Sequence, residues 1–175
     1  ICDKIEKKLF LARDRFGKKP LYYCQYRNSF YFASKVKAIL EFGVIPRKLN
    51  KEGLLDFFNY RYVLGGDTLF NGIKSLLPAH YAIVENGKLH KQVRYWELPV
   101  IAQKEDPGEA EAIRNTTELM IESVQLRLRS DVATGAYLSG GLDSSLIVAL
   151  MSSLLNKQIK TFSIGFPEEG FSELK

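Results

Sequence analysis

One seven-residue stretch, Ser139-Gly140-Gly141-Leu142-Asp143-Ser144-Ser145, separates two apolar runs and indicates how the second half of the chain folds. Residues 135–138 before it suit a short strand, and residues 146–151 after it suit a helix. Two glycines let backbone N–H groups approach an anion without an intervening Cβ atom. The serines can cap the helix and donate hydroxyl hydrogen bonds at its N-terminus, where the helix dipole places partial positive charge. The order strand, glycine turn and helix therefore predicts a pocket for the phosphate groups of a nucleotide.

Asp143 is the acidic group of this stretch. Its carboxylate would repel bare phosphate, so its presence indicates either a bridging Mg²⁺ or a role in capping the helix. Two other phosphate motifs are excluded, because no Gly-Lys-Ser/Thr follows the glycines and no third glycine falls at the spacing of a dinucleotide fingerprint. An ordinary turn with an N-cap is the alternative, and the full stretch between strand and helix favours the phosphate site.

Composition is typical of a soluble globular protein. Of the 175 residues, 46% are hydrophobic and 26% are charged, and the apolar runs stay below the ~18 residues needed to span a bilayer. The net charge of +5 comes from scattered basic residues, which favours a solvated surface over a nucleic-acid patch. Two cysteines without a Cys-x-x-Cys pair predict neither a disulfide framework nor a zinc site. We expect a cytoplasmic protein with neither a membrane nor a nucleic-acid partner.

The two ends of the chain resemble cut ends. The chain begins with Ile1 rather than a methionine, and residues 172–175 read like the opening of a capped helix. We therefore expect an internal segment of a longer protein.

Strand and turn signals alternate through residues 1–98. The expected elements are strands at 8–13, 21–26 and 30–33, a turn at 14–17, helices at 35–40 and 50–60, and a hairpin at 81–93. Ser34 and Asn50 are the expected N-caps of the two helices. Asn86-Gly87 is the strongest two-residue signal for a hairpin turn. Residues 1–40 are thus expected to form β structure closed by a helix.

The second half begins with a polar connection at 99–108, where we place the main domain boundary. A long amphipathic helix is expected at 109–129, with an apolar stripe that includes Ile113 and Val124. A further strand at 160–166 completes a strand–helix–strand pattern, which implies a right-handed parallel unit. Ligands in such sheets bind at the carboxyl ends of the strands.

Leu138 and Ile164 would end two neighbouring strands at that edge. Their backbone and side chains are candidates for the walls of an adenine pocket. Plain core-strand positions are the alternative for both residues, and the two roles are compatible.

Further motifs extend the pattern to the whole chain. The stretch at 139–145 resembles the PP-loop of the ATP pyrophosphatases, which split ATP between its α and β phosphates. The other motifs resemble, in order and spacing, those of glutamine-hydrolysing asparagine synthetases: LARDRFG at 11–17, KPLYY at 19–23, FASKVKA at 32–38, TLFNGI at 68–73, LPAHY at 77–81, RYW at 94–96, RLRSDV at 127–132 and FSIGF at 162–166. Several separate motifs at matching spacing are more specific than one phosphate loop.

The resemblance implies a fold in two parts. Residues 1–98 would be an α+β remnant of a glutaminase of the N-terminal nucleophile type, comprising the C-terminal part of that domain plus a linker. Residues 99–175 would be the N-terminal part of an α/β synthetase domain. That domain would have the parallel sheet of the PP-loop ATP pyrophosphatases, which is adenine nucleotide α-hydrolase-like.

The resemblance also implies the activity of the parent enzyme. Aspartate would be converted to asparagine through β-aspartyl-AMP, with ATP and Mg²⁺ as cofactors, glutamine as the ammonia source, and AMP and PPi as products. The implied ATP site consists of Leu138, Ser139, Gly140, Gly141, Asp143, Ser144, Ser145 and Ile164. The glycine and serine donors would hold pyrophosphate, Asp143 would orient Mg²⁺ or the loop, and Leu138 and Ile164 would contact adenosine.

The resemblance places none of the catalytic residues of the glutaminase reaction in this chain. The nucleophile of that family is an N-terminal cysteine, and Cys2 is not its counterpart because the surrounding stretch aligns deep inside the glutaminase domain. We expect Cys2 to be a buried, inert strand residue. Arg13-Asp14 is expected to be a structural turn in which Asp14 forms an ion pair with Arg13 or Arg15.

Alternatives to this function stay open. A related amidotransferase would use the same two domains on another acceptor, such as a β-lactam precursor or a sugar acid. Another PP-loop enzyme, such as a synthetase for NAD or GMP, is disfavoured, because those enzymes carry ammonia-supplying modules unlike residues 8–40. The chain by itself is alternatively an inactive nucleotide-binding fragment. Assembly as a homodimer is left open as well.

Overall fold

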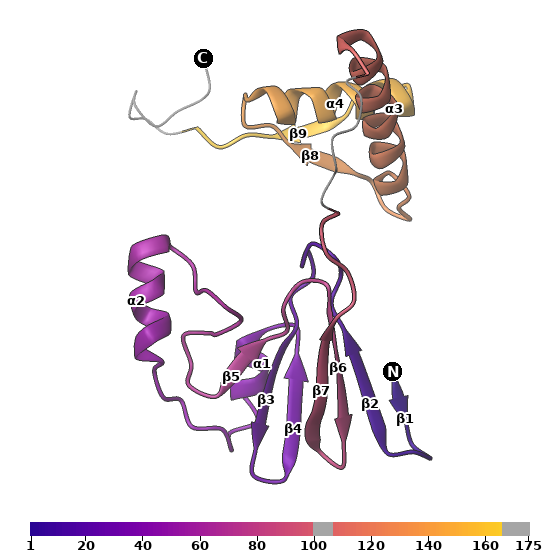
Figure 1. Cartoon of the computed structure of the whole chain (residues 1–175). Helices are drawn as coiled ribbons and strands as arrows, with labels where there is room; N and C mark the ends of the chain where they lie inside the picture. The colour runs from indigo at the N-terminus through magenta and orange to yellow at the C-terminus, as the bar shows by residue number, and fades with distance from the viewer. Residues whose placement is uncertain (100–106, 166–175) are drawn as a thin grey trace. The chain divides into compact units, whose positions relative to one another are not determined.

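The computed structural model describes residues 1–99 and 107–165, which belong to two compact units (Figure 1). The first unit covers Ile1–Ile101 and the second covers Ala102–Lys175. None of the helices that the structure describes combines the length and the apolar composition of a membrane-spanning segment.

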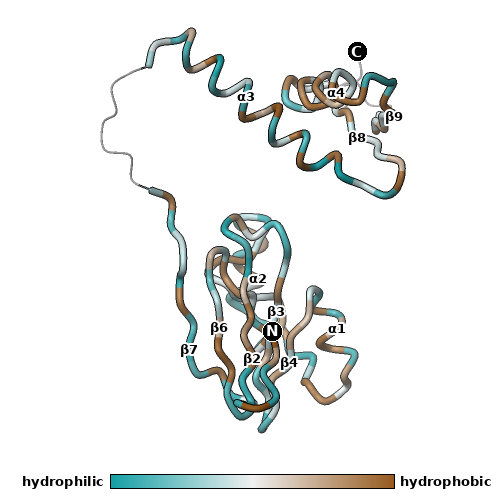
Figure 2. Tube along the Cα trace, turned by 90° about the vertical axis from the view of Figure 1, so that its right-hand side faces the viewer, coloured by the Kyte–Doolittle hydropathy of each residue, from teal (hydrophilic) through white to brown (hydrophobic). Residues whose placement is uncertain are grey.

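Two antiparallel sheets form the first unit. One sheet has the strand order β1-β2-β6-β7, with the strands Cys2–Asp3, Lys8–Ala12, His80–Glu85 and Lys88–Arg94. The other has the order β4-β3-β5, with the strands Ser29–Ala33, Tyr22–Tyr26 and Ile73–Ser75. Figure 2 shows β6 as largely hydrophobic and the neighbouring edge strand β7 as largely hydrophilic. Burial decreases in the same direction, because β6 has buried positions and β7 has only exposed or partly exposed ones.

Apolar side chains from both sheets form one core between them. Its buried members are Leu11, Leu76 and Ala82, and Leu9, Leu21, Tyr23, Phe30 and Leu89 pack against these. A second core lies where α1 (Val36–Leu40) packs on β3 and β4. Its buried members are Cys24, Ile39, Leu40, Ile45 and Ile73. Tyr23 and Cys24 are neighbours on β3 and contribute to different cores, because successive strand residues point to opposite faces.

The predicted hairpin at residues 81–93 is confirmed. β6 and β7 are antiparallel, and Glu85 pairs with Lys88 across a two-residue turn. Both turn residues have positive φ, +50° for Asn86 and +75° for Gly87. This is the backbone that a type I′ turn requires, and asparagine and glycine adopt it most readily.

Both predicted helices of the first unit are present; the predicted N-cap is confirmed for α2 (Lys51–Tyr60) and wrong for α1. α1 has Lys35 as its N-cap residue, so Ser34 is not the cap. α2 has Asn50 at the N-cap position, but the side chain of Asn50 makes no capping bond. Instead, Asn50 Nδ2 donates to the carbonyl oxygen of Thr68 at 3.0 Å. The amide thus ties the start of α2 to a segment that follows the helix.

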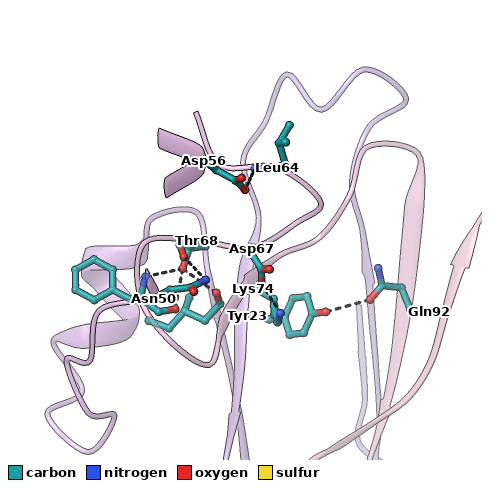
Figure 3. Close-up of polar contacts among 10 residues, drawn as sticks. Tyr23, Asn50, Asp56, Leu64, Asp67, Thr68, Lys74 and Gln92 are labelled. Atoms are coloured by element: carbon teal, nitrogen blue, oxygen red, sulfur yellow. Dashed lines mark hydrogen bonds and ion pairs between the residues drawn. The ribbon is translucent and has the colours of Figure 1, made fainter. Parts of the chain in front are cut away.

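Side-chain hydrogen bonds hold the segment between α2 and β5 (Figure 3). The carboxylate of Asp56 accepts a hydrogen bond from Leu64 N–H at 3.1 Å, and Lys74 forms an ion pair with Asp67. The buried Thr68 hydroxyl lies 2.8 Å from the carbonyl oxygen of Ile73 and donates to it. These contacts order the connection between α2 and β5.

The two cysteines lie in different environments. Cys24 is buried, whereas Cys2 is exposed. The prediction that Cys2 lies in a strand is confirmed, but the prediction that it is buried is wrong. The reason is that β1 is a two-residue edge strand whose residues are both exposed.

The second unit combines two helices with a pair of parallel strands. Its elements are α3 (Glu109–Arg127), β8 (Gly135–Tyr137), α4 (Leu142–Leu155) and β9 (Lys160–Phe162). The parallel pairing of β8 with β9 confirms the predicted strand–helix–strand pattern. Gly135 allows the two strands to pack closely, because a Cβ atom at this position would lie 2.9 Å from the carbonyl oxygen of Lys160.

Two elements of this unit are shorter than predicted. The helix expected at 109–129 ends at Arg127, and the strand expected at 160–166 ends at Phe162. Phe166 lies outside the described residues. α4 is hydrophobic along most of its length (Figure 2), and it lies against α3, where Val124 and Met151 are buried. Leu142 is nevertheless 83% exposed, so part of the apolar surface of α4 faces solvent in the described chain.

Candidate functional site

The loop between β8 and α4 requires glycine at one of its two glycine positions. Gly140 has φ of +93°, which residues with a Cβ atom rarely adopt. Gly141 is the N-cap residue of α4 with φ of −73°, and a Cβ atom there would meet only Ser139 Oγ, at 3.5 Å. The positive φ therefore explains why position 140 is a glycine. At position 141, the missing side chain leaves space for an approaching group.

Three serine hydroxyls are joined through Gly141. Ser144 Oγ and Ser145 Oγ donate to the carbonyl oxygen of Gly141 at 3.0 Å and 2.9 Å. Ser139 Oγ lies 3.0 Å from Ser144 Oγ and accepts a hydrogen bond from Gly141 N–H at 3.4 Å. Because the proton of Ser144 is directed to Gly141, Ser139 supplies the proton in the contact between the two serines. The hydroxyls of Ser139, Ser144 and Ser145 thus form a hydrogen-bonded hydroxyl chain around Gly141.

The serines do not cap α4 in the way that the sequence predicted. Their hydroxyls donate to a carbonyl oxygen instead of accepting hydrogen bonds from the first-turn amides, and α4 has no side-chain cap among the described residues. A helix leaves its first N–H groups without intrahelical partners, and these groups attract anions. The start of α4 therefore presents amide donors beside the hydroxyl chain.

Asp143 lies in the first turn of α4, where its negative charge is favourable to the helix dipole. The described residues hold no group of three or more His, Cys, Asp and Glu side chains that could bind a metal ion by themselves. One carboxylate fits the way Mg²⁺ is bound in nucleotide sites, where phosphate oxygens and water supply most ligands. Asp143 could therefore serve as one ligand of Mg²⁺, provided that a phosphate substrate supplies further ligands.

Leu138 and Ile164 lie at the same edge of the strand pair. Leu138 follows β8, and its N–H donates to the carbonyl oxygen of Phe162 at 2.9 Å. Ile164 follows β9 by two residues and is 73% exposed, so it is not a core-strand residue. The structure therefore brings both residues, the loop and the first turn of α4 to the carboxyl ends of β8 and β9.

One residue at this edge makes a contact that the sequence pattern did not predict. The hydroxyl of Ser163 donates to the carbonyl oxygen of Leu138, with 2.6 Å between the oxygens. The two residues are 25 positions apart, so their contact depends on the pairing of β8 with β9. The signal available in the sequence was a hydroxyl residue directly after the second strand.

The turn predicted at residues 14–17 is present, but its chemistry differs from the prediction. The carboxylate of Asp14 accepts hydrogen bonds from the backbone N–H groups of Lys19 (2.9 Å), Lys18 (2.9 Å) and Phe16 (3.2 Å). The N–H groups of Lys19 and Lys18 are the main reason that the pKa of Asp14 lies below its ordinary value. Asp14 is absent from the ion pairs of the described residues, so the predicted pair with Arg13 or Arg15 is wrong.

An open cavity of about 710 Å³ lies in the first unit. Its apolar walls include Tyr22, Leu64 and Phe70, and Arg13 and Ser75 add polar groups. The lining residues come from segments far apart in the chain, which is why the sequence pattern did not indicate it.

Comparison with known proteins gives two family matches in chain order. Residues 1–96 match the family model described as a glutamine amidotransferase domain, and residues 115–175 match the one described as asparagine synthase. The chain therefore belongs to the family of glutamine amidotransferase domains, and its residues 115–175 are similar to asparagine synthase. Within that class, it is homologous to glutamine-hydrolysing asparagine synthetases over nearly its whole length.

Three relatives illustrate this similarity. Glutamine-hydrolysing asparagine synthetase 1 of Bacillus subtilis is 33% identical over 175 residues, which are 99% of this chain and 27% of the relative. Asparagine synthetase 3 of the same organism is 35% identical over 177 residues, 96% of this chain and 28% of the relative. Amidase chry2 of Gibberella zeae is 32% identical over 166 residues, 91% of this chain and 24% of the relative. The chain thus spans about a quarter of the length of these relatives.

Proposed function

We propose that residues 139–145 are the PP-loop of an enzyme that converts aspartate to asparagine with ATP, using ammonia from glutamine. The observation that carries this proposal is the loop itself, with Gly140 in a left-handed conformation and serine hydroxyls beside the start of α4, at the carboxyl ends of two parallel strands. The family match of residues 115–175 to asparagine synthase supports it. Helix N-termini of this kind bind phosphate groups.

The proposed domains follow the resemblance. Residues 1–98 are the C-terminal part of a glutaminase domain of the N-terminal nucleophile type, plus a linker. Residues 99–175 are the start of a synthetase domain with the PP-loop fold. The match of residues 1–96 to the glutamine amidotransferase family supports the first assignment, and the parallel pair of β8 and β9 supports the second.

In this proposal, the loop binds the pyrophosphate part of ATP. The backbone N–H groups of Ser139 and Gly140 face the phosphate oxygens, and that of Gly141 joins them once its hydrogen bond to Ser139 Oγ is released. The hydroxyls of Ser144 and Ser145 rotate away from the carbonyl oxygen of Gly141 and donate to the phosphate. Such a hydrogen bond to a charged acceptor is about twice as strong as one to a neutral carbonyl, which favours the exchange.

The chemistry needs positioning and charge stabilisation. The β-carboxylate of aspartate attacks the α-phosphorus of ATP, and pyrophosphate leaves with the electron pair of the broken P–O bond. The loop donors stabilise the negative charge that grows on the bridging oxygen. Ammonia then displaces AMP from β-aspartyl-AMP and gives asparagine. Bound Mg²⁺ would supply further neutralisation of phosphate charge, and Asp143 would contribute one carboxylate to it.

Leu138 and Ile164 are proposed to contact the adenosine part. Both are aliphatic, and both lie within three residues of the hydrogen-bonded end of a strand. Apolar walls of this kind exclude water from one side of a base, while backbone groups next to them fix its orientation.

A second candidate function is amidation of an acceptor other than aspartate. The similarity to amidase chry2, at 32% identity against 33% for asparagine synthetase 1, favours keeping it, because this relative does not carry the name of an asparagine synthetase. Both candidates share the ATP site of this chain. They differ in the acceptor. Exchange of labelled pyrophosphate into ATP by the longer enzyme should depend on aspartate if aspartate is the acceptor, and on another acid if it is not.

Isothermal titration of the chain with MgATP tests the shared site. The wild type is expected to bind, and Asp143→Ala and Ser144→Ala are expected to abolish the specific heat. Ser152→Ala is the matched control, because its hydroxyl donates to Lys157 O at 3.2 Å at the other end of α4. Equal heats for the wild type and all three variants would contradict the site.

A further inference from the structure

The hydroxyl of Ser163 replaces a backbone hydrogen bond at the end of the parallel strand pair. β8 and β9 pair from Gly135 with Lys160 to Tyr137 with Phe162. Leu138 N–H continues this ladder by donating to the carbonyl oxygen of Phe162 at 2.9 Å. In a parallel ladder, the next donor to Leu138 would be the backbone N–H two residues beyond Phe162. In this structure, the carbonyl oxygen of Leu138 accepts the hydroxyl of Ser163 instead, at 2.6 Å.

Both polar groups of the Leu138 backbone are therefore held by the end of β9. This matters for the next residue, because a trans peptide is planar and directs its C=O and N–H to opposite sides. While Ser163 holds the carbonyl of Leu138 toward β9, the N–H of Ser139 must point away from β9. That N–H is the first of the loop amides assigned above to pyrophosphate.

We propose that Ser163 is a positioning residue, which orients the peptide between Leu138 and Ser139 so that the amide of Ser139 faces the phosphates. This inference rests on the proposed function of the loop. Without the hydroxyl, the peptide is free to rotate, and a rotated peptide directs the carbonyl oxygen of Leu138 toward the phosphates. That change removes one donor and adds one repulsive acceptor.

The adjacent side chain makes the effect specific to the phosphate part of the ligand. Ser139 Oγ accepts from Gly141 N–H and contacts Ser144 Oγ, so the orientation of Ser139 is shared with the hydroxyl chain of the loop. Ile164, in contrast, lies beyond Ser163 on the same segment and has no bond to the loop amides among the contacts of the described residues. Loss of the Ser163 hydroxyl should weaken phosphate binding and leave adenosine contacts in place.

The test is titration of the chain with MgATP, with pyrophosphate and with AMP at concentrations up to the millimolar range. Ser163→Ala is expected to weaken binding of ATP and pyrophosphate roughly tenfold to a hundredfold, the range for a hydrogen bond to a charged group, and to leave AMP binding unchanged. Ser163→Thr keeps the hydroxyl and is expected to restore the wild-type affinities. Ser152→Ala, which removes a serine-to-carbonyl bond at the far end of α4, is expected to change none of them.

The outcomes separate this inference from the function on which it rests. A wild-type chain that does not bind MgATP overturns the proposed function and this inference with it. If the wild type binds MgATP and the Ser163→Ala variant binds it with equal affinity, only the positioning role is overturned. Equal weakening of AMP and ATP, or failure of Ser163→Thr to restore binding, shows a general structural role and also overturns it. Circular dichroism of each variant checks that the second unit is folded.

Discussion

The hydroxyl of Ser144 donates a hydrogen bond to the carbonyl oxygen of Gly141, with 3.0 Å between the two oxygens. A serine at the start of a helix usually accepts a hydrogen bond from a backbone amide, and here the direction is reversed. The carbonyl oxygen of Gly141 thus holds the hydroxyl proton, while the amides of the first turn keep their capacity for an anion. The phosphate binding proposed for this loop would therefore need only rotation of side chains, with the backbone unchanged.

Gly140→Ala and Gly141→Ala are expected to differ in stability. Alanine at position 140 would adopt φ of +93°, so we expect the second unit to lose about 1–2 kcal/mol. Alanine at position 141 has an ordinary φ of −73° and room for its methyl group, so the change should stay within about 0.5 kcal/mol. Urea unfolding followed by circular dichroism measures both, and equal losses would contradict the loop geometry.

Gly53→Ala is expected to destabilise the first unit, although alanine usually stabilises a helix by about 1 kcal/mol relative to glycine. A Cβ atom at position 53 would lie 2.7 Å from the carbonyl oxygen of Thr68. The backbone must therefore shift, at a cost of about 1–3 kcal/mol. Asn59→Ala, at an exposed position of α2, is the control and should be neutral or slightly stabilising. Thermal unfolding compares the two, and a more stable Gly53→Ala variant would show that α2 packs less closely.

Arg13→Lys is expected to destabilise the first unit by about 2–3 kcal/mol, because an ammonium group cannot replace the planar guanidinium. The guanidinium donates to four acceptors: Lys19 O, Ser75 Oγ, Leu76 O and Gly17 O. Arg15→Lys is the control, since among the described residues the side chain of Arg15 contacts the ring of Trp96, 5.7 Å from its centroid, and makes no hydrogen bond. That variant should cost less than about 1 kcal/mol. Similar losses in urea unfolding would argue against the role of Arg13.

Acid should remove the stabilisation that Asp14 provides. The N–H groups of Lys19 and Lys18 lower the pKa of Asp14 in the folded chain, so its carboxylate stabilises the fold above the unfolded-state pKa of about 4. This contribution is lost as the pH falls from that value through the lower folded-state pKa. Asp14→Asn should therefore be less stable than the wild type at pH 7, and the difference should shrink below about pH 4. A difference that does not change with pH would contradict the prediction.

The cysteines should react at very different rates. Cys2 is exposed, whereas Cys24 is 2% exposed and burial raises the pKa of its thiol, which reduces the thiolate available for reaction. Iodoacetamide is expected to modify Cys2 in the folded chain and Cys24 only after unfolding in urea. Mass spectrometry of timed samples measures this, and early modification of Cys24 would show that the core around α1 opens readily.

Local patterns predicted most of the elements correctly. The Asn86-Gly87 turn and the strand–loop–helix–strand order of the second unit follow from backbone preferences of neighbouring residues, and both are present. The ends of elements were predicted less accurately: β9 was expected to reach residue 166 and ends at Phe162, where its pairing with β8 ends. The extent of this pairing depends on β8, which is distant from β9 in the sequence.

The sequence by itself determined which residues form the candidate phosphate loop, because glycine conformation and helix initiation depend on adjacent residues. Only the tertiary structure decided what the side chains contact. In the folded chain, the Asp14 carboxylate accepts hydrogen bonds from backbone amides, and Cys2 is exposed on an edge strand. The Ser163 hydroxyl donates to the carbonyl oxygen of Leu138. Hydrogen-bond partners and burial depend on which distant segments pack together, and that information is absent from any single stretch of residues.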